Sequence, residues 1–218
     1  MTLLHYSPPM HPYLSLLYRD DDIVVVNKPS GLLSVPGKER QHHDSTYSRV
    51  LTVLPTARVV HRLDMATSGI VLFALNKTAQ AHIQRQFERR SVGKTYRAQV
   101  FGVPPASAGA IDLPMRCDWP NRPRQMVDLV LGKSAQTSYR VMHTTALGAM
   151  LELTPISGRS HQLRVHMQAL GTPICGDKFY AEGLAFSAAP RLLLHAESLR
   201  LQHPTSGVEL KFHCPAEF

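Results

Sequence analysis

A short polar segment, residues 61–69 with the sequence HRLDMATSG, combines residue types that can carry out chemistry. It lies between two apolar runs, residues 59–60 and 70–75, a pattern that predicts two buried strands joined by a surface turn. Arg62 and Asp64 are two residues apart, so their side chains share a face where the chain is extended. A guanidinium beside a carboxyl group lowers the pKa of that group and keeps it ionised. By itself the segment is either a catalytic turn or a turn held by an exposed ion pair.

The distribution of charge favours an anionic partner. The chain has 24 Lys and Arg against 16 Asp and Glu, a formal net charge of +8. Residues 45–63, 89–111 and 153–176 contain no acidic residue. Their basic residues include Arg49, Arg58, Arg62, Arg89, Arg90, Lys94, Arg97, Arg159, His161, Arg164 and His166. Arginines without local carboxylates favour an external anion, and a nucleic-acid backbone supplies phosphates. A basic face that is only solvated is the alternative.

Composition excludes several classes of protein. The 218 residues fit one domain, and three widely spaced cysteines favour reduced thiols in a reducing compartment. No signal peptide and no apolar run of membrane-spanning length is present, so we expect a cytoplasmic protein, and a monomer. His42 and His43 have no third ligand nearby, so no metal is expected. The polar segment has one carboxylate, whereas most glycosidases need two.

Hydrophobic periodicity predicts an α+β fold with a mixed, mostly antiparallel central sheet flanked by helices and loops. Strands are expected at residues 23–26, 94–100, 135–142, 149–153, 192–201 and 208–212, and helices at residues 44–54, 77–90 and 160–170. In residues 94–100, Tyr96, Ala98 and Val100 are expected to share one face. Ser160 is a candidate N-cap of the last helix, and Gly171 is its expected C′ residue.

Two stretches lack clear periodicity. Residues 112–128 are rich in proline and arginine and contain the single tryptophan, and we expect an ordered loop with Arg116, Arg122 and Arg124 exposed. Residues 1–17 contain three prolines and are expected to form an arm on the surface. Residues 18–218 would then form one catalytic domain.

The motifs resemble, in order, those of the RluA family of pseudouridine synthases. Residues 61–69 resemble the catalytic signature of that family. The other matching segments are DDIVVVNKPSG at 21–31, KTY at 94–96, GRSHQLRVH at 158–166, GD at 176–177 and LLHA at 193–196. The loop DWPNRP at 118–123 is similar to that of the dual-specificity members. The resemblance extends from about residue 18 to the end, without the S4-type RNA-binding domain that many relatives carry.

The resemblance implies a pseudouridine synthase fold and isomerisation of uridine to pseudouridine in RNA, with no cofactor and no metal. It implies that Asp64 attacks or deprotonates the ribose and that Tyr96 stacks on the uracil. Arg164 would pair with Asp64, Leu163 would line the site, and Arg62 would enter the RNA stack. Flipping a base out of the stack costs a few kcal/mol, and stacking of that base on an aromatic side chain contributes about 1–3 kcal/mol in the opposite direction. Each of these residues also has a simpler explanation when it is considered alone. Tyr96 and Leu163 would then be core residues, and Arg164 would be a surface cation.

Further residues are candidates for binding the substrate or the RNA backbone. They are Lys94, Arg159 and His161 for the substrate and Arg89, Arg90, Arg116, Arg122 and Arg124 for RNA. The expected substrates are the anticodon stem-loop of tRNAs and a hairpin loop of 23S rRNA. Two alternatives remain: a non-catalytic RNA-binding or RNA-folding module, which the set of Asp64, Tyr96 and Arg164 disfavours, and an RNA N-glycosidase, which the single carboxylate disfavours.

Overall fold

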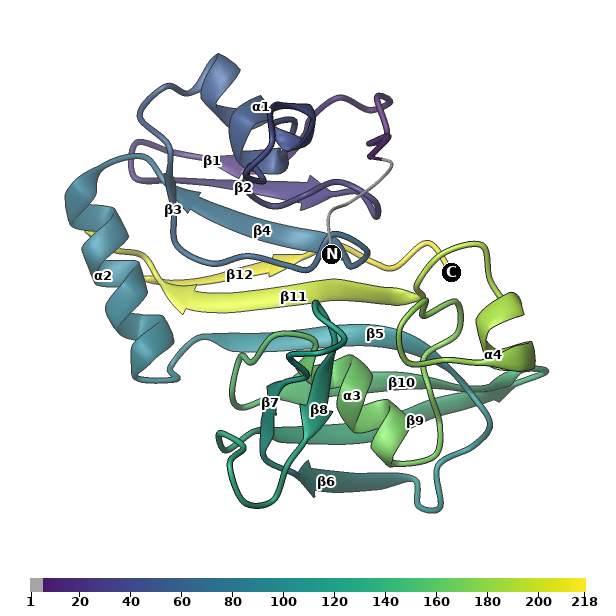
Figure 1. Cartoon of the computed structure of the whole chain (residues 1–218). Helices are drawn as coiled ribbons and strands as arrows, with labels where there is room; N and C mark the ends of the chain where they lie inside the picture. The colour runs from purple at the N-terminus through teal and green to yellow at the C-terminus, as the bar shows by residue number, and fades with distance from the viewer. Residues whose placement is uncertain (1–5) are drawn as a thin grey trace. The chain divides into compact units, whose positions relative to one another are not determined.

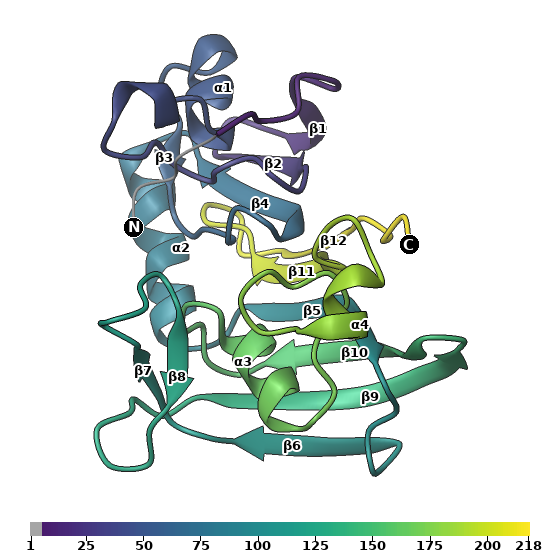
Figure 2. The same ribbon diagram turned by 45° about the vertical axis from the view of Figure 1, so that its right-hand side comes forward.

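A computed structural model describes residues 6–218 of the chain. These residues divide into two compact units, whose elements are labelled in Figures 1 and 2. The N-terminal unit comprises residues 6–94 and 196–216, and the central unit comprises residues 95–195 and 217–218. Residues 1–5 of the expected N-terminal arm lie outside the described residues. The catalytic segment, residues 61–69, belongs to the N-terminal unit, and the motif GRSHQLRVH at 158–166 belongs to the central unit.

The N-terminal unit has the strand order β1-β2-β4-β11. Strands β1, β2 and β4 pair antiparallel, as do β3 with β4 and β12 with β11. The strands are β1 (Ser15–Arg19), β2 (Ile23–Lys28), β3 (Arg58–Val59), β4 (Ser68–Ala74), β11 (Leu194–Gln202) and β12 (Glu209–His213). The helices are α1 (Thr46–Val53), α2 (Lys77–Glu88) and the short 3-10 helix Arg40–His42. Helix α2 packs on β3 and β4.

The apolar runs of the sequence become the core of this unit. Ile23, Val25, Ile70 and Leu72 from β2 and β4 pack with Ile83 of α2. Strand β4 is buried along its whole length, which explains why its sequence is continuously apolar rather than alternating. Both long helices begin at a polar N-cap: the side chains of Ser45 and Asn76 accept hydrogen bonds from the backbone N–H groups three residues on, at 3.1 and 2.8 Å.

The central unit contains strands in the order β5-β10-β9-β6, and each neighbouring pair is antiparallel. Its strands are β5 (Gly93–Phe101), β6 (Ala108–Asp112), β9 (Gln136–Thr145) and β10 (Gly148–Pro155). Helix α3 (Gln162–Ala169) packs on β9 and β10 and also contacts the separate hairpin of β7 (Met115–Cys117) and β8 (Gln125–Val127). The short helix α4 covers Gly183–Ser187.

The expected α+β fold, its helices and its main strands are confirmed, and four local predictions are wrong. Residues 112–128 form the β7–β8 hairpin rather than a loop alone, because Met115 and Val127 pair across it. The last part of the expected arm, residues 15–17, lies in β1. Arg124, which was expected to be exposed in residues 112–128, is half-buried.

The fourth correction concerns the start of α3. Its N-cap is His161 rather than Ser160, and His161 has the left-handed backbone conformation with φ of 55°. Gly171 follows the C-cap with φ of 81°, as expected for a C′ glycine. No helix among residues 6–218 is both long enough and apolar enough to span a membrane.

Candidate active site

The catalytic segment, residues 61–69, runs from β3 into β4, and a neighbouring turn at residues 28–34 holds it in place. Side chains and one backbone N–H group of the turn donate hydrogen bonds to carbonyl groups of the segment. They are Ser30 Oγ to Ala66 O at 2.7 Å, Gly31 N to Met65 O at 2.9 Å and Ser34 Oγ to Leu63 O at 2.7 Å; Ser34 Oγ also accepts from Leu63 N at 3.0 Å. Asp64 is half-buried between these anchored residues. Its backbone position is therefore defined on both sides.

Lys28, at the end of β2, is a buried cation that the sequence analysis did not single out. Its side chain is fully buried, and Nζ donates to Pro29 O, Leu32 O and Met65 O at 2.9, 2.7 and 3.0 Å. Burial lowers the pKa of Lys28 to about 7, and the negative charge of Asp64 opposes that shift. Three carbonyl acceptors match the three donors of the ammonium form. Lys28 thus places a positive charge close to Asp64 and ties the two turns together.

Arg62 is exposed, and among residues 6–218 no ion pair joins it to Asp64. The hypothesis that an ion pair between Arg62 and Asp64 holds the turn is therefore wrong. An exposed arginine beside a half-buried carboxylate is available for contact with an external group. This agrees with the alternative expectation that Arg62 faces RNA, which stays a prediction.

His61, the first residue of the catalytic segment, and Lys94 both contact the ring of Phe87. His61 stacks on Phe87 with ring centroids 5.0 Å apart, and Lys94 Nζ lies 5.9 Å from the same ring. His61 Nε2 accepts a hydrogen bond from Leu72 N at 2.9 Å, which places the proton of the neutral ring on Nδ1. Burial lowers the pKa of His61 to about 4, and the charge of Lys94 acts in the same direction. His61 is thus a neutral structural residue, and burial also lowers the pKa of Lys94.

Arg164, in α3, is buried rather than a surface cation. Its Nε and Nη2 donate to Oδ2 and Oδ1 of Asp177, both at 2.7 Å, and Asp177 is itself fully buried. The guanidinium carbon lies 5.3 and 5.1 Å from the ring centroids of Phe179 and Tyr180. The sequence analysis identified Asp177 only as part of the GD motif at 176–177 and did not predict that it pairs with Arg164. The pairing of Arg164 with Asp64 stays a prediction.

The other candidate residues of the site lie in the central unit. Tyr96 is half-buried on β5, opposite Leu153 of β10, and Leu163 is buried on α3. Nδ1 of His161 is 2.6 Å from the hydroxyl of Tyr180, so this histidine is engaged within the protein. Arg159 is exposed, with Nε donating to Ser134 O at 3.3 Å.

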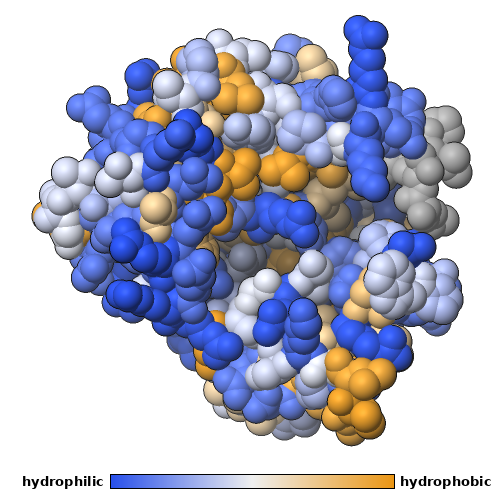
Figure 3. Space-filling model, turned by 60° about the vertical axis from the view of Figure 1, so that its left-hand side comes forward, coloured by the Kyte–Doolittle hydropathy of each residue, from blue (hydrophilic) through white to orange (hydrophobic). Residues whose placement is uncertain are grey.

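The basic side chains of the three segments without acidic residues, 45–63, 89–111 and 153–176, are not all exposed. Arg49, in the first of these segments, is fully buried and makes a bidentate pair with Asp44, at 2.8 and 2.7 Å. Outside these segments, Arg116 pairs with Asp128 and is half-buried, against the expectation that it is exposed. Among the arginines proposed to bind substrate or RNA, Arg62, Arg89, Arg90, Arg122 and Arg159 are exposed. Hydrophilic side chains predominate on the face shown in Figure 3.

Among the described residues, no group of three or more His, Cys, Asp or Glu side chains is placed to hold a metal ion. His42 is buried and lies edge-on against the ring of Tyr6, with centroids 5.8 Å apart. His42 therefore packs within the N-terminal unit.

Comparison with known proteins identifies the class of enzyme. A family model described as RNA pseudouridylate synthase matches residues 22–169, which include Asp64, Tyr96 and Arg164. The chain therefore belongs to the RNA pseudouridylate synthase family. It is 53% identical, over the full length of both chains, to a protein of Escherichia coli strain K12 named dual-specificity RNA pseudouridine synthase RluA. A protein of Haemophilus influenzae with the same name is 50% identical, again over both full lengths. The expected membership of the RluA family is confirmed.

Solved structures of similar proteins share the fold of this chain. Human RNA pseudouridylate synthase domain containing 1 matches with a TM-score of 0.77 and 32% identity, over 93% of this chain and 83% of that one. Human RNA pseudouridylate synthase domain containing 4 matches with a TM-score of 0.75 and 28% identity, over 93% of this chain and 88% of that one. The pseudouridine synthase fold expected from the motifs is confirmed.

Proposed function

We propose that the protein converts specific uridines of RNA into pseudouridine with Asp64 as the catalytic carboxylate. Isomerisation of uridine in RNA is the activity of the family to which the chain belongs. The observation that supports the role of Asp64 is its position in a turn whose neighbours Leu63, Met65 and Ala66 are all held by hydrogen bonds. Such bracing keeps a reacting group in position without reorganisation during the reaction.

The chemistry needs one carboxylate rather than two. The bond between C1′ of the ribose and N1 of uracil breaks, the uracil turns, and C5 bonds to C1′ while its proton leaves. Because the uracil is retained, activation of water by a second carboxylate would divert the reaction to hydrolysis. Asp64 would attack or deprotonate the ribose, and Tyr96 would stack on the flipped uracil and assist proton transfer at C5.

We also propose that Arg164 pairs with Asp64 in the working enzyme. The guanidinium has five N–H donors, and Asp177 binds the edge formed by Nε and Nη2. The edge formed by Nη1 and Nη2 has the geometry to bind another carboxylate in the same plane. Asp177 and the rings of Phe179 and Tyr180 then serve to orient this arginine.

For the substrate, we propose the anticodon stem-loop of tRNAs and a hairpin loop of 23S rRNA. Relatives 53% and 50% identical carry "dual-specificity" in their names. Unpaired bases in a loop can be flipped at a smaller cost than paired ones, which favours such substrates. One catalytic domain in residues 18–218, the monomeric state and the cytoplasmic location stay predictions.

Release of tritium from RNA labelled at C5 of uracil tests the proposal, because C5 loses its hydrogen when it bonds to the ribose. The wild-type protein should release tritium from a tRNA anticodon stem-loop. Asp64→Asn should lower the rate roughly 1,000-fold or more while leaving RNA binding in place. Asp21→Asn, at an exposed carboxylate of the same unit, is the matched control and should retain full activity. Release by Asp64→Asn at the wild-type rate would refute the assignment, and binding without release by the wild type would favour a non-catalytic RNA-binding module.

A further inference from the structure

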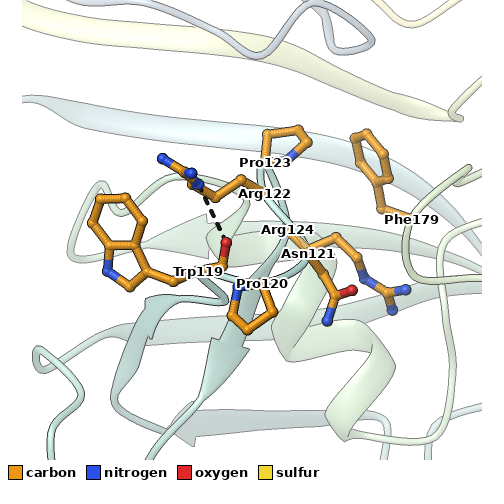
Figure 4. Close-up of a pocket in the computed structure, with 7 residues that line it drawn as sticks. All are labelled: Trp119, Pro120, Asn121, Arg122, Pro123, Arg124 and Phe179. Atoms are coloured by element: carbon orange, nitrogen blue, oxygen red, sulfur yellow. Dashed lines mark hydrogen bonds between the residues drawn. The ribbon is translucent and has the colours of Figure 1, made fainter. Parts of the chain in front are cut away.

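The β7–β8 hairpin carries a pocket at its tip, which Figure 4 shows in close-up. The pocket has a volume of about 430 Å³ and lies within the central unit. It is lined by Trp119, Pro120, Asn121, Arg122, Pro123, Arg124 and Phe179. In Figure 4 the ring of Trp119 and the side chain of Arg122 lie on one side of the loop, and the side chains of Arg124 and Phe179 lie on the other side. The volume is in the range that small ligands occupy.

The tip is organised by its own hydrogen bonds. Asp118 N donates to Arg124 O at 3.0 Å, and Arg124 N donates to Asn121 O at 3.0 Å. The side chain of Asn121 donates to the carboxylate of Asp118, also at 3.0 Å. Directly after the tip loop, Gln125 N donates to the hydroxyl of Tyr180 at 2.8 Å. A binding surface that is already ordered loses little conformational entropy when a ligand arrives.

Trp119 is unusual because it is 63% exposed although tryptophan is a large apolar residue. The guanidinium carbon of Arg122 lies 4.5 Å from its ring centroid, and Arg122 Nε donates to Trp119 O at 3.2 Å. Arg122 therefore covers one part of the indole and holds its orientation, and much of the indole remains open to solvent.

The charge of the tip is not neutralised. Arg116 at the base of the hairpin pairs with Asp128, but neither Arg122 nor Arg124 forms an ion pair with any of residues 6–218. Asp118, the one carboxylate in the loop, accepts a hydrogen bond from Asn121 instead. The tip thus combines an open aromatic ring with two positive charges that lack anions.

We propose that this pocket binds one unpaired nucleotide of the RNA, other than the uridine that reacts. Its base stacks on the indole of Trp119, and its phosphate contacts Arg122, whose guanidinium carbon lies 4.5 Å from the centroid of the same ring. Arg124, which lies 5.6 Å from the ring of Tyr180, adds positive charge on the other side of the loop. Stacking on an aromatic ring tolerates any base, so the pocket selects for an unpaired nucleotide at the right position rather than for a sequence. The proposal rests on the function proposed above and adds a second point of contact with the RNA loop.

The fluorescence of Trp119 tests this directly, because the chain has no other tryptophan. Titration of the slow Asp64→Asn variant with an anticodon stem-loop should quench the emission. The same RNA annealed to its full complement and a polyglutamate peptide should leave the emission unchanged. No change at saturating stem-loop RNA would refute the proposal. An equal change with the duplex or the peptide would show a general anion surface and would refute it as well.

Kinetics supply a second readout. Trp119→Ala should raise KM for the stem-loop roughly tenfold with kcat little changed, and Trp119→Phe should restore most of the affinity. Phe186→Ala removes another exposed aromatic ring of the central unit and is the matched control, with an unchanged KM expected. An unchanged KM in Trp119→Ala would refute the proposal. Tritium release by the wild type without quenching of Trp119 would refute the pocket alone, whereas quenching without release would refute the proposed activity alone.

Discussion

Lys28 shows at the residue scale how the N-terminal unit organises the catalytic segment. A fully buried lysine is costly unless its ammonium group is satisfied, and here three backbone carbonyls satisfy it. One of them belongs to Met65, the residue after Asp64. The same side chain therefore fixes the backbone of the segment and supplies a positive charge near the carboxylate.

We expect Lys28→Met to lower the free energy of unfolding by about 2 kcal/mol, because buried carbonyl groups lose their donor. The change should also lower kcat roughly 10-fold or more, since Asp64 is no longer held in position. Urea unfolding and tritium release measure the two effects. Lys38→Met, at an exposed lysine of the same unit, should change neither. Wild-type stability in Lys28→Met would contradict the bracing role.

At the scale of elements, the catalytic segment depends on close contact between strands of the N-terminal unit. Gly69, at the start of β4, has φ of 113°, which side chains rarely permit. A Cβ atom there would lie 2.4 Å from the backbone O and 2.6 Å from the backbone N of Ala196 in β11. The glycine that ends the catalytic signature is therefore required by packing between β4 and β11.

Gly69→Ala should lower the free energy of unfolding by about 3 kcal/mol or more, because backbone atoms of β4 or β11 have to move. Gly207→Ala is the matched control: Gly207 also has positive φ, 71°, but no atom lies within 4 Å of its added Cβ. That variant should lose only about 1 kcal/mol. Chemical denaturation of both variants measures the difference, and equal losses would show that conformation alone, rather than contact with Ala196, requires the glycine.

At the scale of the whole molecule, the net charge of +8 is the main feature. Not every arginine faces solvent, since Arg49 and Arg164 are buried in ion pairs with Asp44 and Asp177. The exposed arginines are those available for phosphates, and each phosphate that is neutralised releases counterions. RNA affinity should therefore depend strongly on salt, with a slope set by the exposed arginines rather than by the total.

With about five phosphate contacts, RNA affinity should fall roughly 100-fold between 50 and 200 mM salt. Arg89→Gln combined with Arg90→Gln should reduce the slope of log K against log salt by about 1–2. Arg140→Gln should leave it unchanged, because Arg140 is exposed but paired with Glu152 at 2.9 Å. Binding isotherms at several salt concentrations provide the slopes, and a flat response of the wild type would contradict RNA binding through phosphates.

The sequence by itself determined the α+β class, the main helices and strands, and the family. These follow from periodicity and from motifs of neighbouring residues, such as the segment around Asp64, and both are properties of local sequence. It also indicated that Arg62 and Asp64 need not be partners, which the structure confirms.

Only the tertiary structure decided which charges are internal and what holds the site. Arg164 is a buried partner of Asp177, and Lys28 is a buried donor to Met65, although charge counts alone assign both to the surface. The direction and burial of a side chain depend on which segments pack around it, and no short window of sequence contains that information. The pocket beside Trp119 is of the same kind, because Phe179, which lines one side, lies 60 residues further along the chain.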